Sequence, residues 1–339
     1  MCILNKVLTK KSIIVIVSTA IVLAVILFSF SQGWLGLSSH ADESQSLESS
    51  ANAKFLDFAA SNIAALGDIN GDGYVDFGIG GASESLNKTL IIFGKESGFS
   101  GEYTMLDADA SFIGENHEDW AGNVTGVGDV NGDGYDDFII GAPLNSENGY
   151  RAGKVYLILG KTDGWELNVS LANSDASFLG EYEDDIAGRF VSGVGDVNGD
   201  GYDDFLISAE QNSQVAWTSG KVYLIFGKET GWSNGINLVN ADASFLGEAA
   251  NNLLGYGIAG VGDVNGDGYD DFLISAANNH EGAMGGGQVY LVMGAENGWL
   301  TDQSIETVST ASFMGTEEDI GMMVGTRTVS AAGDVNGDG

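Results

Sequence analysis

The chain of 339 residues contains 48 acidic and 13 basic residues, which gives a formal net charge of −35 at pH 7, while 44% of its residues are hydrophobic. A chain with this much apolar sequence can bury a core, so the acidic composition does not indicate a disordered tail. Its negative field repels phosphate backbones and attracts cations. The composition therefore predicts no nucleic-acid partner.

The turn-forming residues and the cysteine content limit the fold class. The chain contains 51 glycines, one proline and one cysteine, Cys2. Glycine and asparagine must therefore make most turns, which favours many short strands joined by tight loops. A single cysteine cannot form an intramolecular disulfide, so an exported domain needs another stabilising device, and bound metal is one.

Residues 1–41 differ from the rest of the chain. Three lysines between positions 6 and 11 precede an apolar run, Ile13 to Phe30, and no charge follows until Asp42. This order is typical of an export signal, although the run is long for a signal peptide and short for a spanning helix. We predict an N-terminal hydrophobic helix that inserts into the membrane at least during export. It is either a signal peptide cleaved after Ala41 or a retained signal anchor, so the remainder is secreted or on the cell surface.

Residues 42–53 read as a polar linker, and residues 54–339 repeat one acidic phrase. The phrase GDVNGDGYDDF occurs at 128–138, 195–205 and 262–272, with a near copy, GDINGDGYVDF, at 67–77 and a partial copy, GDVNGDG, at 333–339. Successive copies stand 61 to 71 residues apart, which indicates one structural unit per copy.

Each unit contains about four short β-runs rich in branched and aromatic residues. In the unit built on the third copy, the predicted strands are Arg189–Val194, Phe205–Ser208, Lys221–Phe226 and Ile236–Phe245, the last with a break near Asn240. The run KVYLIFG lacks polar alternation, so we expect it to be buried on both faces. Repeated units of four antiparallel strands predict an all-β fold, a β-propeller of four-stranded blades.

The acidic phrase has the donor pattern of a hard-cation site. Counting from Asp129, side-chain oxygens stand at positions 1, 3, 5 and 9, a backbone carbonyl is offered at position 7, and glycine occupies positions 4 and 6. Calcium takes six or more oxygen ligands from such a loop, whereas magnesium, the second choice, demands a tighter octahedron. With three scattered histidines and no cysteine nearby, zinc and copper are disfavoured.

The predicted calcium ligands include the residue at position 7 through its carbonyl. They are Asp68, Asn70, Asp72, Tyr74 and Asp76; Asp129, Asn131, Asp133, Tyr135 and Asp137; Asp196, Asn198, Asp200, Tyr202 and Asp204; Asp263, Asn265, Asp267, Tyr269 and Asp271; and Asp334, Asn336 and Asp338 in the partial copy. We expect a structural ion, because calcium wrapped by protein does not activate a substrate. The acids at position 8, Asp136, Asp203 and Asp270, are expected to point to solvent.

Two other loop types use similar letters. A metal-free Asn-Gly or Asp-Gly hairpin turn is the first, but the identical oxygen pattern in four complete copies favours metal. An EF-hand, or the related dockerin loop, is the second. It needs an acid at position 12 and flanking helices. Position 12 holds Ile79, Ile140, Ile207 and Ile274, and a β-run follows each copy. The loop therefore joins two strands.

The sequence offers three candidate aromatic platforms but no catalytic motif that singles out a site. Trp165, Trp232 and Trp299 stand at a fixed step after a glycine, where they could stack on sugars but more often pack blades. The chain has no His-Glu-x-x-His phrase, and its three histidines are scattered along the sequence. Acid pairs for glycosidase chemistry exist, but no pair is singled out. We therefore predict that the chain itself is not an enzyme.

The combined pattern resembles a known repeat family. Phe178-Leu179-Gly180, the Asp-x-Asn-x-Asp-Gly-x-x-Asp loops and Gly141-Ala142-Pro143 are similar to the FG-GAP repeats of integrin alpha-chain propellers and their bacterial relatives. The resemblance covers roughly 54–339 and implies a seven-bladed propeller with calcium in hairpin loops on one face, of which this chain would supply about four and a half blades. Two features depart from the pattern: Gly-Ala-Pro is complete once, and Phe55-Leu56-Asp57 ends in aspartate.

The leading functional hypothesis is an exported or cell-surface, calcium-stabilised β-propeller that acts as a binding or adhesion module. Its partner would be an extracellular protein or carbohydrate that meets the loops at one end of the propeller. The alternative is the non-catalytic propeller portion of a larger secreted hydrolase whose catalytic domain lies beyond residue 339. Catalysis by the propeller itself is a third hypothesis.

Overall fold

The computed structural model describes residues 15–18, 21–26, 53–55, 60–81, 87–282, 286–315 and 329–330. Between residues 62 and 314 the chain forms four successive units, each an antiparallel sheet of four strands in sequence order. The predicted all-β class is confirmed, and the sheets have the composition expected for propeller blades.

The strand bounds follow the repeated letters. Unit one comprises β4 (Asn62–Gly67), β5 (Asp76–Gly80), β6 (Lys88–Ile92) and β8 (Ala110–Ile113). Unit two comprises β9 (Asn123–Gly128), β10 (Asp137–Ala142), β11 (Lys154–Ile158) and β13 (Ala176–Leu179). Unit three comprises β14 (Val191–Gly195), β15 (Asp204–Ala209), β16 (Lys221–Ile225) and β18 (Ala243–Leu246). Unit four comprises β19 (Leu254–Gly262), β20 (Asp271–Ala276), β21 (Gln288–Val292) and β23 (Ala311–Met314).

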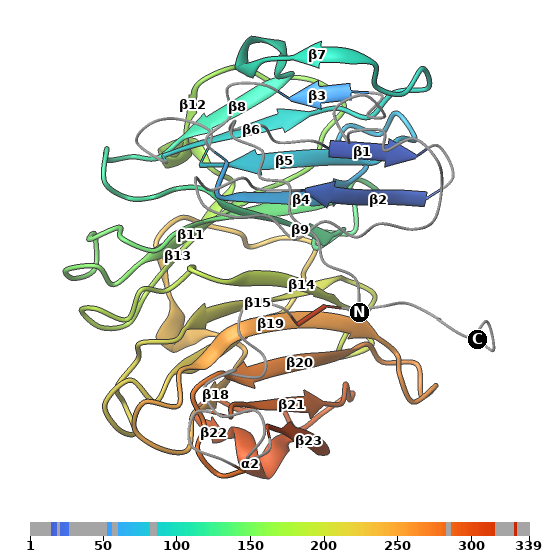
Figure 1. Ribbon diagram of the computed structural model, residues 1–339. Coiled ribbons are helices and arrows are strands. Elements are labelled where there is room, and N and C mark those ends of the chain that lie inside the picture. Colours follow the sequence, from blue (N-terminus) through green and yellow to red (C-terminus); the bar gives the residue numbers. More distant parts are fainter. Residues whose placement is uncertain are drawn as a thin grey trace, which may run out of the picture.

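The first strands of the units lie next to one another at the centre of the molecule. Strand β4 contacts β9, β9 contacts β14, and β14 contacts β19, while the fourth strands lie at the periphery (Figure 1). Adjacent sheets therefore meet face to face, and each interface buries an apolar cluster drawn from two units, such as Ile139 and Leu157 with Phe205 and Ile207. Every residue of β11 and β16 is buried, which confirms the prediction for the KVYLI strands.

Short extra strands connect neighbouring sheets. Strands β12 (Val169–Ser170), β17 (Ile236–Asn237) and β22 (Gln303–Ser304) pair in parallel with the outer strand of the preceding unit, and β7 (Gly101–Tyr103) pairs with β3 (Ala53–Phe55) in the same way. The predicted run Ile236–Phe245 is therefore split. Its first residues join the sheet of unit two, the 3-10 turn η3 (Leu238–Asn240) follows, and the rest forms β18.

Three further short helical turns stand at the equivalent place in the other units. They are η1 (Met105–Asp107), η2 (Leu171–Asn173) and α2 (Ile305–Val308). In η2 and η3 the residue before the turn caps it, since a side-chain oxygen of Ser170 or Asn237 accepts a backbone N–H two residues on. The first residue of η2, η3 and α2 is buried, so each turn fixes the outer part of its sheet to the core.

The described part of residues 1–41 forms strands and not the expected helix. Val15–Ser18 and Ile21–Ile26 are strands, β1 and β2, which pair antiparallel with each other. Within the described ranges no helix is long and apolar enough to cross a membrane. The predicted linker lies outside the described residues except for Ala53, which begins β3, and Asp334, Asn336 and Asp338 also lie outside them.

Candidate functional site

The acidic loops connect the first strand of each unit to the second and share one conformation. In the loop that follows β9, Asp129 Oδ1 accepts the backbone N–H groups of Gly132 and Asp133 at 2.7 and 3.0 Å, and Oδ2 accepts that of Gly134 at 2.8 Å. The two glycines have φ of 72° and 91°, a left-handed conformation that glycine adopts without strain. The glycines at positions 4 and 6 are therefore required by the backbone.

The side chains at positions 3 and 5 complete the loop. Asn131 Oδ1 accepts the N–H of Asp133 at 2.9 Å, and Asn131 Nδ2 donates to Asp133 Oδ2 at 2.9 Å. Asp133 Oδ1 in turn accepts the N–H of Tyr135 at 3.0 Å. The other three described loops repeat these bonds. Hydrogen bonds within each loop thus already hold the predicted ligands at positions 1, 3 and 5 close together.

The aspartate at position 9 lies at the base of the loop and is fully buried in all four units. Asp137 Oδ2 accepts the N–H of Val130 at 3.0 Å, and Oδ1 accepts that of Gly160 at 2.7 Å. Burial raises the pKa of Asp137 to about 8, and the nearby Asp133 and Asp129 carboxylates add to the rise in pKa. Burial also raises the pKa of Asp204 to about 8 and that of Asp76 to about 7.

The donor set fits a hard divalent cation in chemistry. It consists of oxygens only, and burial and the acidic neighbours disfavour the ionised form of Asp137, which a bound cation would stabilise. In the described ranges, however, no three His, Cys, Asp or Glu side chains converge as a formed metal shell. The carboxylates are instead directed at backbone N–H groups of their own loop.

The prediction that the position-8 acids point to solvent is wrong. Each accepts a hydrogen bond from the backbone N–H of position 1 in the preceding loop, and its own N–H donates back to the position-1 carbonyl. The acceptor bonds are Asp68 N to Asp136 Oδ2 at 2.7 Å, Asp129 N to Asp203 Oδ2 at 2.9 Å and Asp196 N to Asp270 Oδ2 at 3.1 Å. The return bonds measure 3.3, 3.3 and 3.0 Å. We call this reciprocal pair of bonds the inter-loop clamp.

Two further contacts accompany the clamp. A Cβ at Gly132 would lie 2.7 Å from the ring of Tyr202, so the position-7 tyrosine of one loop covers the position-4 glycine of the loop before it. The N–H of Lys228 donates to the carbonyl of Val130 at 2.8 Å, which ties the end of β16 to the same loop. The first copy has Val75 at position 8, and no copy precedes it in the chain. That difference is the sequence signal from which the clamp could have been predicted.

The three tryptophans pack between neighbouring blades, since each contacts aromatic rings of two successive units, and this confirms the packing role that was favoured. Trp232 lies against Phe205 in a stacked arrangement with ring centroids 6.4 Å apart, and its Nε1 donates to the Lys228 carbonyl at 3.0 Å. The Lys228 ammonium lies over the Trp232 ring, 4.6 Å from the ring centroid. Trp165 and Trp299 make the same stack and the same backbone bond. Their rings are used in packing, so they are not sugar platforms.

At the opposite end of the sheets, a buried ionic network that sequence reasoning missed joins units one and two. Lys154 Nζ, almost fully buried, donates to Glu115 and Glu147 at 2.6 Å each, and the Tyr156 hydroxyl donates to Glu115 at 3.0 Å. Burial lowers the pKa of Lys154, but these two carboxylates outweigh it, so the net shift of the pKa is upward. Lys221 repeats the arrangement with Glu181.

Comparison with known proteins adds an independent finding. Residues 121–158, 187–225 and 254–292 match the FG-GAP repeat family, and each segment begins at or just before the first strand of a unit and ends with the third. Integrin alpha-V of Gallus gallus is 27% identical over 67% of this chain and 21% of its own length. Integrin alpha-6 of Gallus gallus is 30% identical over 51% of the chain and 15% of its length, and integrin alpha pat-2 of Caenorhabditis briggsae is 28% identical over 65% and 18%. The chain thus spans about a fifth of the relatives it matches.

The inter-loop clamp can be tested by removing its acceptor. We predict that Asp203→Ala lowers the free energy of unfolding by about 1–2 kcal/mol, because the partly buried N–H of Asp129 loses its acceptor. Urea unfolding followed by circular dichroism measures the change. Asp203→Asn keeps an amide oxygen and should recover most of it, and Val75→Ala, at the position without a clamp, is the matched control. Equal stability of Asp203→Ala and the wild type would contradict the clamp.

The packing role of the tryptophans gives a second prediction. Trp232→Ala should lower the free energy of unfolding by about 3–5 kcal/mol, because it removes a ring that fills the space between Phe178 and Phe205. Trp232→Phe should lose less. The measurement is thermal or urea unfolding of the three proteins side by side, and a Trp232→Ala protein of unchanged stability would show that the ring is not part of the core.

Proposed function

We propose that this FG-GAP repeat protein, similar in sequence to integrin alpha chains, is a calcium-stabilised β-propeller that serves as a binding or adhesion module outside the cell. The observation that carries the proposal is the difference between the two ends of the sheets. At one end the acidic loops repeat and are clamped to each other. At the other end the equivalent connections differ from unit to unit, as loops that recognise a partner do.

Calcium is the proposed ion of the four complete loops. The residues that would hold it are those at positions 1, 3, 5 and 9 with the carbonyl of position 7, for example Asp129, Asn131, Asp133, Asp137 and Tyr135. The bound ion would supply positive charge among three carboxylates, two of them in the loop and one buried at its base. Because the buried aspartate has a raised pKa without a cation, ion binding and folding should be coupled.

Export is proposed from the order of charged and apolar residues in the first 41 positions. The relatives are integrin alpha chains, and a secreted or cell-surface location agrees with that similarity. An extracellular partner, protein or carbohydrate, follows from the same two lines of support.

Calcium stabilisation is tested by the melting temperature of the chain in calcium and in chelator. A site filled at about 100 times its dissociation constant contributes about 2.7 kcal/mol, so chelation should lower the melting temperature by several degrees and calcium should restore it. Magnesium should restore less. Asp133→Asn keeps the bond to the N–H of Tyr135 but removes a charge, so it should reduce the calcium-dependent shift. Asp163→Asn, an exposed acid outside the loops, is the control. Identical melting in calcium and chelator would refute the calcium proposal.

The binding role is tested with the immobilised chain and a panel of purified extracellular-matrix glycoproteins, each used before and after enzymatic deglycosylation. We expect saturable, calcium-dependent binding of at least one member, recorded by interferometry. Binding of no panel member at micromolar concentration, by a protein that melts cooperatively in calcium, would contradict the adhesion proposal.

A further inference from the structure

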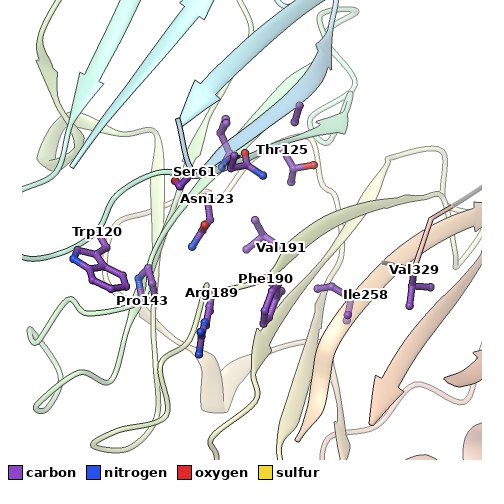
Figure 2. A pocket seen from close by; sticks show the side chains of 14 residues that line it. Ser61, Trp120, Asn123, Thr125, Pro143, Arg189, Phe190, Val191, Ile258 and Val329 are labelled. Atoms are coloured by element: carbon purple, nitrogen blue, oxygen red, sulfur yellow. Dashed lines mark hydrogen bonds between the residues drawn. The ribbon is translucent and has the colours of Figure 1, made fainter. Parts of the chain in front are cut away.

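A cavity of about 450 Å³ lies at the end of the sheets opposite the acidic loops, where the first strands of the four units come together (Figure 2). Each unit contributes to its lining, for example through Asn62, Asn123, Val191 and Ile258. Its volume lies within the range of about 300–1,000 Å³ that is typical of small-molecule sites. None of its lining residues is among the predicted calcium ligands.

The indole of Trp120 forms one side of this cavity and departs from the repeat. Trp120, Ile186 and Leu253 occupy the same backbone position, since their φ values are 56°, 57° and 55°. The preceding residues Asp119 and Asp185 are likewise both buried and bonded to an asparagine. Ile186 is 2% exposed, whereas Trp120 is 49% exposed. The backbone is the same without a ring, so the fold does not require the indole at this position.

The facing wall is built from an insertion that unit two lacks. In unit two six residues separate Gly122 from Asp129 of the acidic loop, but in units three and four seven residues separate the equivalent glycine from the equivalent aspartate, and Arg189 or Tyr256 is the additional residue. The Arg189 guanidinium carbon lies 5.8 Å from the Phe190 ring centroid and 5.8 Å from that of Tyr256. Figure 2 shows Trp120 and Pro143 on one side of the cavity and Arg189 with Phe190 on another.

The charge of Arg189 is already matched. Its Nη1 lies 3.0 Å from Oε1 of Glu210, a carboxylate that is fully buried. The guanidinium therefore holds the wall in place and does not present an uncompensated positive charge. Together with the net charge of −35, this pairing disfavours an anionic ligand in the cavity.

Polar groups with hydrogen-bonding capacity line the rest of the cavity. Asn123 Nδ2 donates to the Gly188 carbonyl at 3.4 Å, Ser61 Oγ to the Gly80 carbonyl at 3.3 Å and Thr125 Oγ1 to the Gly126 carbonyl at 3.4 Å. These bonds are long, so each is weak, and each group keeps acceptor lone pairs that its bond does not use. Amide and hydroxyl groups of this kind can exchange bonds with the hydroxyls of a ligand.

We propose that this cavity binds a neutral saccharide, with Trp120 as the stacking platform and Asn123, Ser61 and Thr125 as hydrogen-bond partners of the sugar hydroxyls. A pyranose has an apolar face of C–H groups that matches an indole, and hydroxyls around its edge that match short polar side chains. This inference rests on the proposed function as a binding module and assigns it a site and a ligand class.

The test is calorimetric titration of the full calcium-loaded chain with the methyl glycosides of glucose, galactose, mannose and N-acetylglucosamine, and with glucuronic acid as the charged comparison. At least one neutral glycoside should bind saturably. Trp120→Ala should weaken that binding ~10-fold through loss of the stacked ring, and Trp120→Phe should weaken it less. Trp217→Ala is the matched control, because Trp217 is 72% exposed and does not line the cavity.

The melting temperature of each variant establishes that it is folded, which the exposure of Trp120 leads us to expect. No binding of any neutral glycoside at millimolar concentration, preference for glucuronic acid, or equal loss in the Trp217 variant would overturn the proposal. If deglycosylated matrix proteins still bind while no glycoside does, the saccharide site is wrong and the binding module stands. If neither binds, both proposals fail.

Discussion

The reciprocal hydrogen bonds between successive acidic loops are the constraint on which the arrangement of the sheets depends. Each sheet is built from local hairpins, but its orientation to the next sheet needs directional contacts. The position-8 carboxylate provides one, since it accepts the N–H that opens the preceding loop. The short parallel strands provide another at the outer edge. Apolar packing fills the space between these two points.

This arrangement buries carboxylates, and burial disfavours their ionised form. Fully buried aspartates stand at the base of four neighbouring loops, and burial raises the pKa of three of them, Asp76, Asp137 and Asp204. A chain with no disulfide and a net charge of −35 gains stability there only if the charges are satisfied. Backbone N–H groups do part of this, and a calcium ion would do the rest. The same residues thus serve the turn, the blade interface and the proposed ion.

Much of the fold is predictable from the sequence because each unit repeats the same pattern of turn residues and apolar strands. The glycines at positions 4 and 6, the buried KVYLI strands and the packing of the tryptophans were all predictable from one unit. The fate of Ile236–Asn237 was not, because its partner, β13, lies in the preceding unit and no local pattern names it. The clamp was not predictable from one unit for the same reason, since its two partners lie in successive loops. Residues 15–18 and 21–26 form strands where apolar length alone favoured a helix.

Differences between the units distinguish residues that the backbone requires from residues that it does not require. At a position such as that of Asp203, the residue recurs wherever a preceding loop needs an acceptor and is replaced by Val75 where none precedes. Its identity is explained by the backbone. At the position of Trp120 the backbone recurs, with the same left-handed φ, but the side chain does not. Trp120 lies half-exposed in a cavity beside the additional Arg189. Because the backbone does not require an indole there, the fold does not explain this side chain. In the proposed function, recognition therefore takes place at the end of the sheets where the units differ.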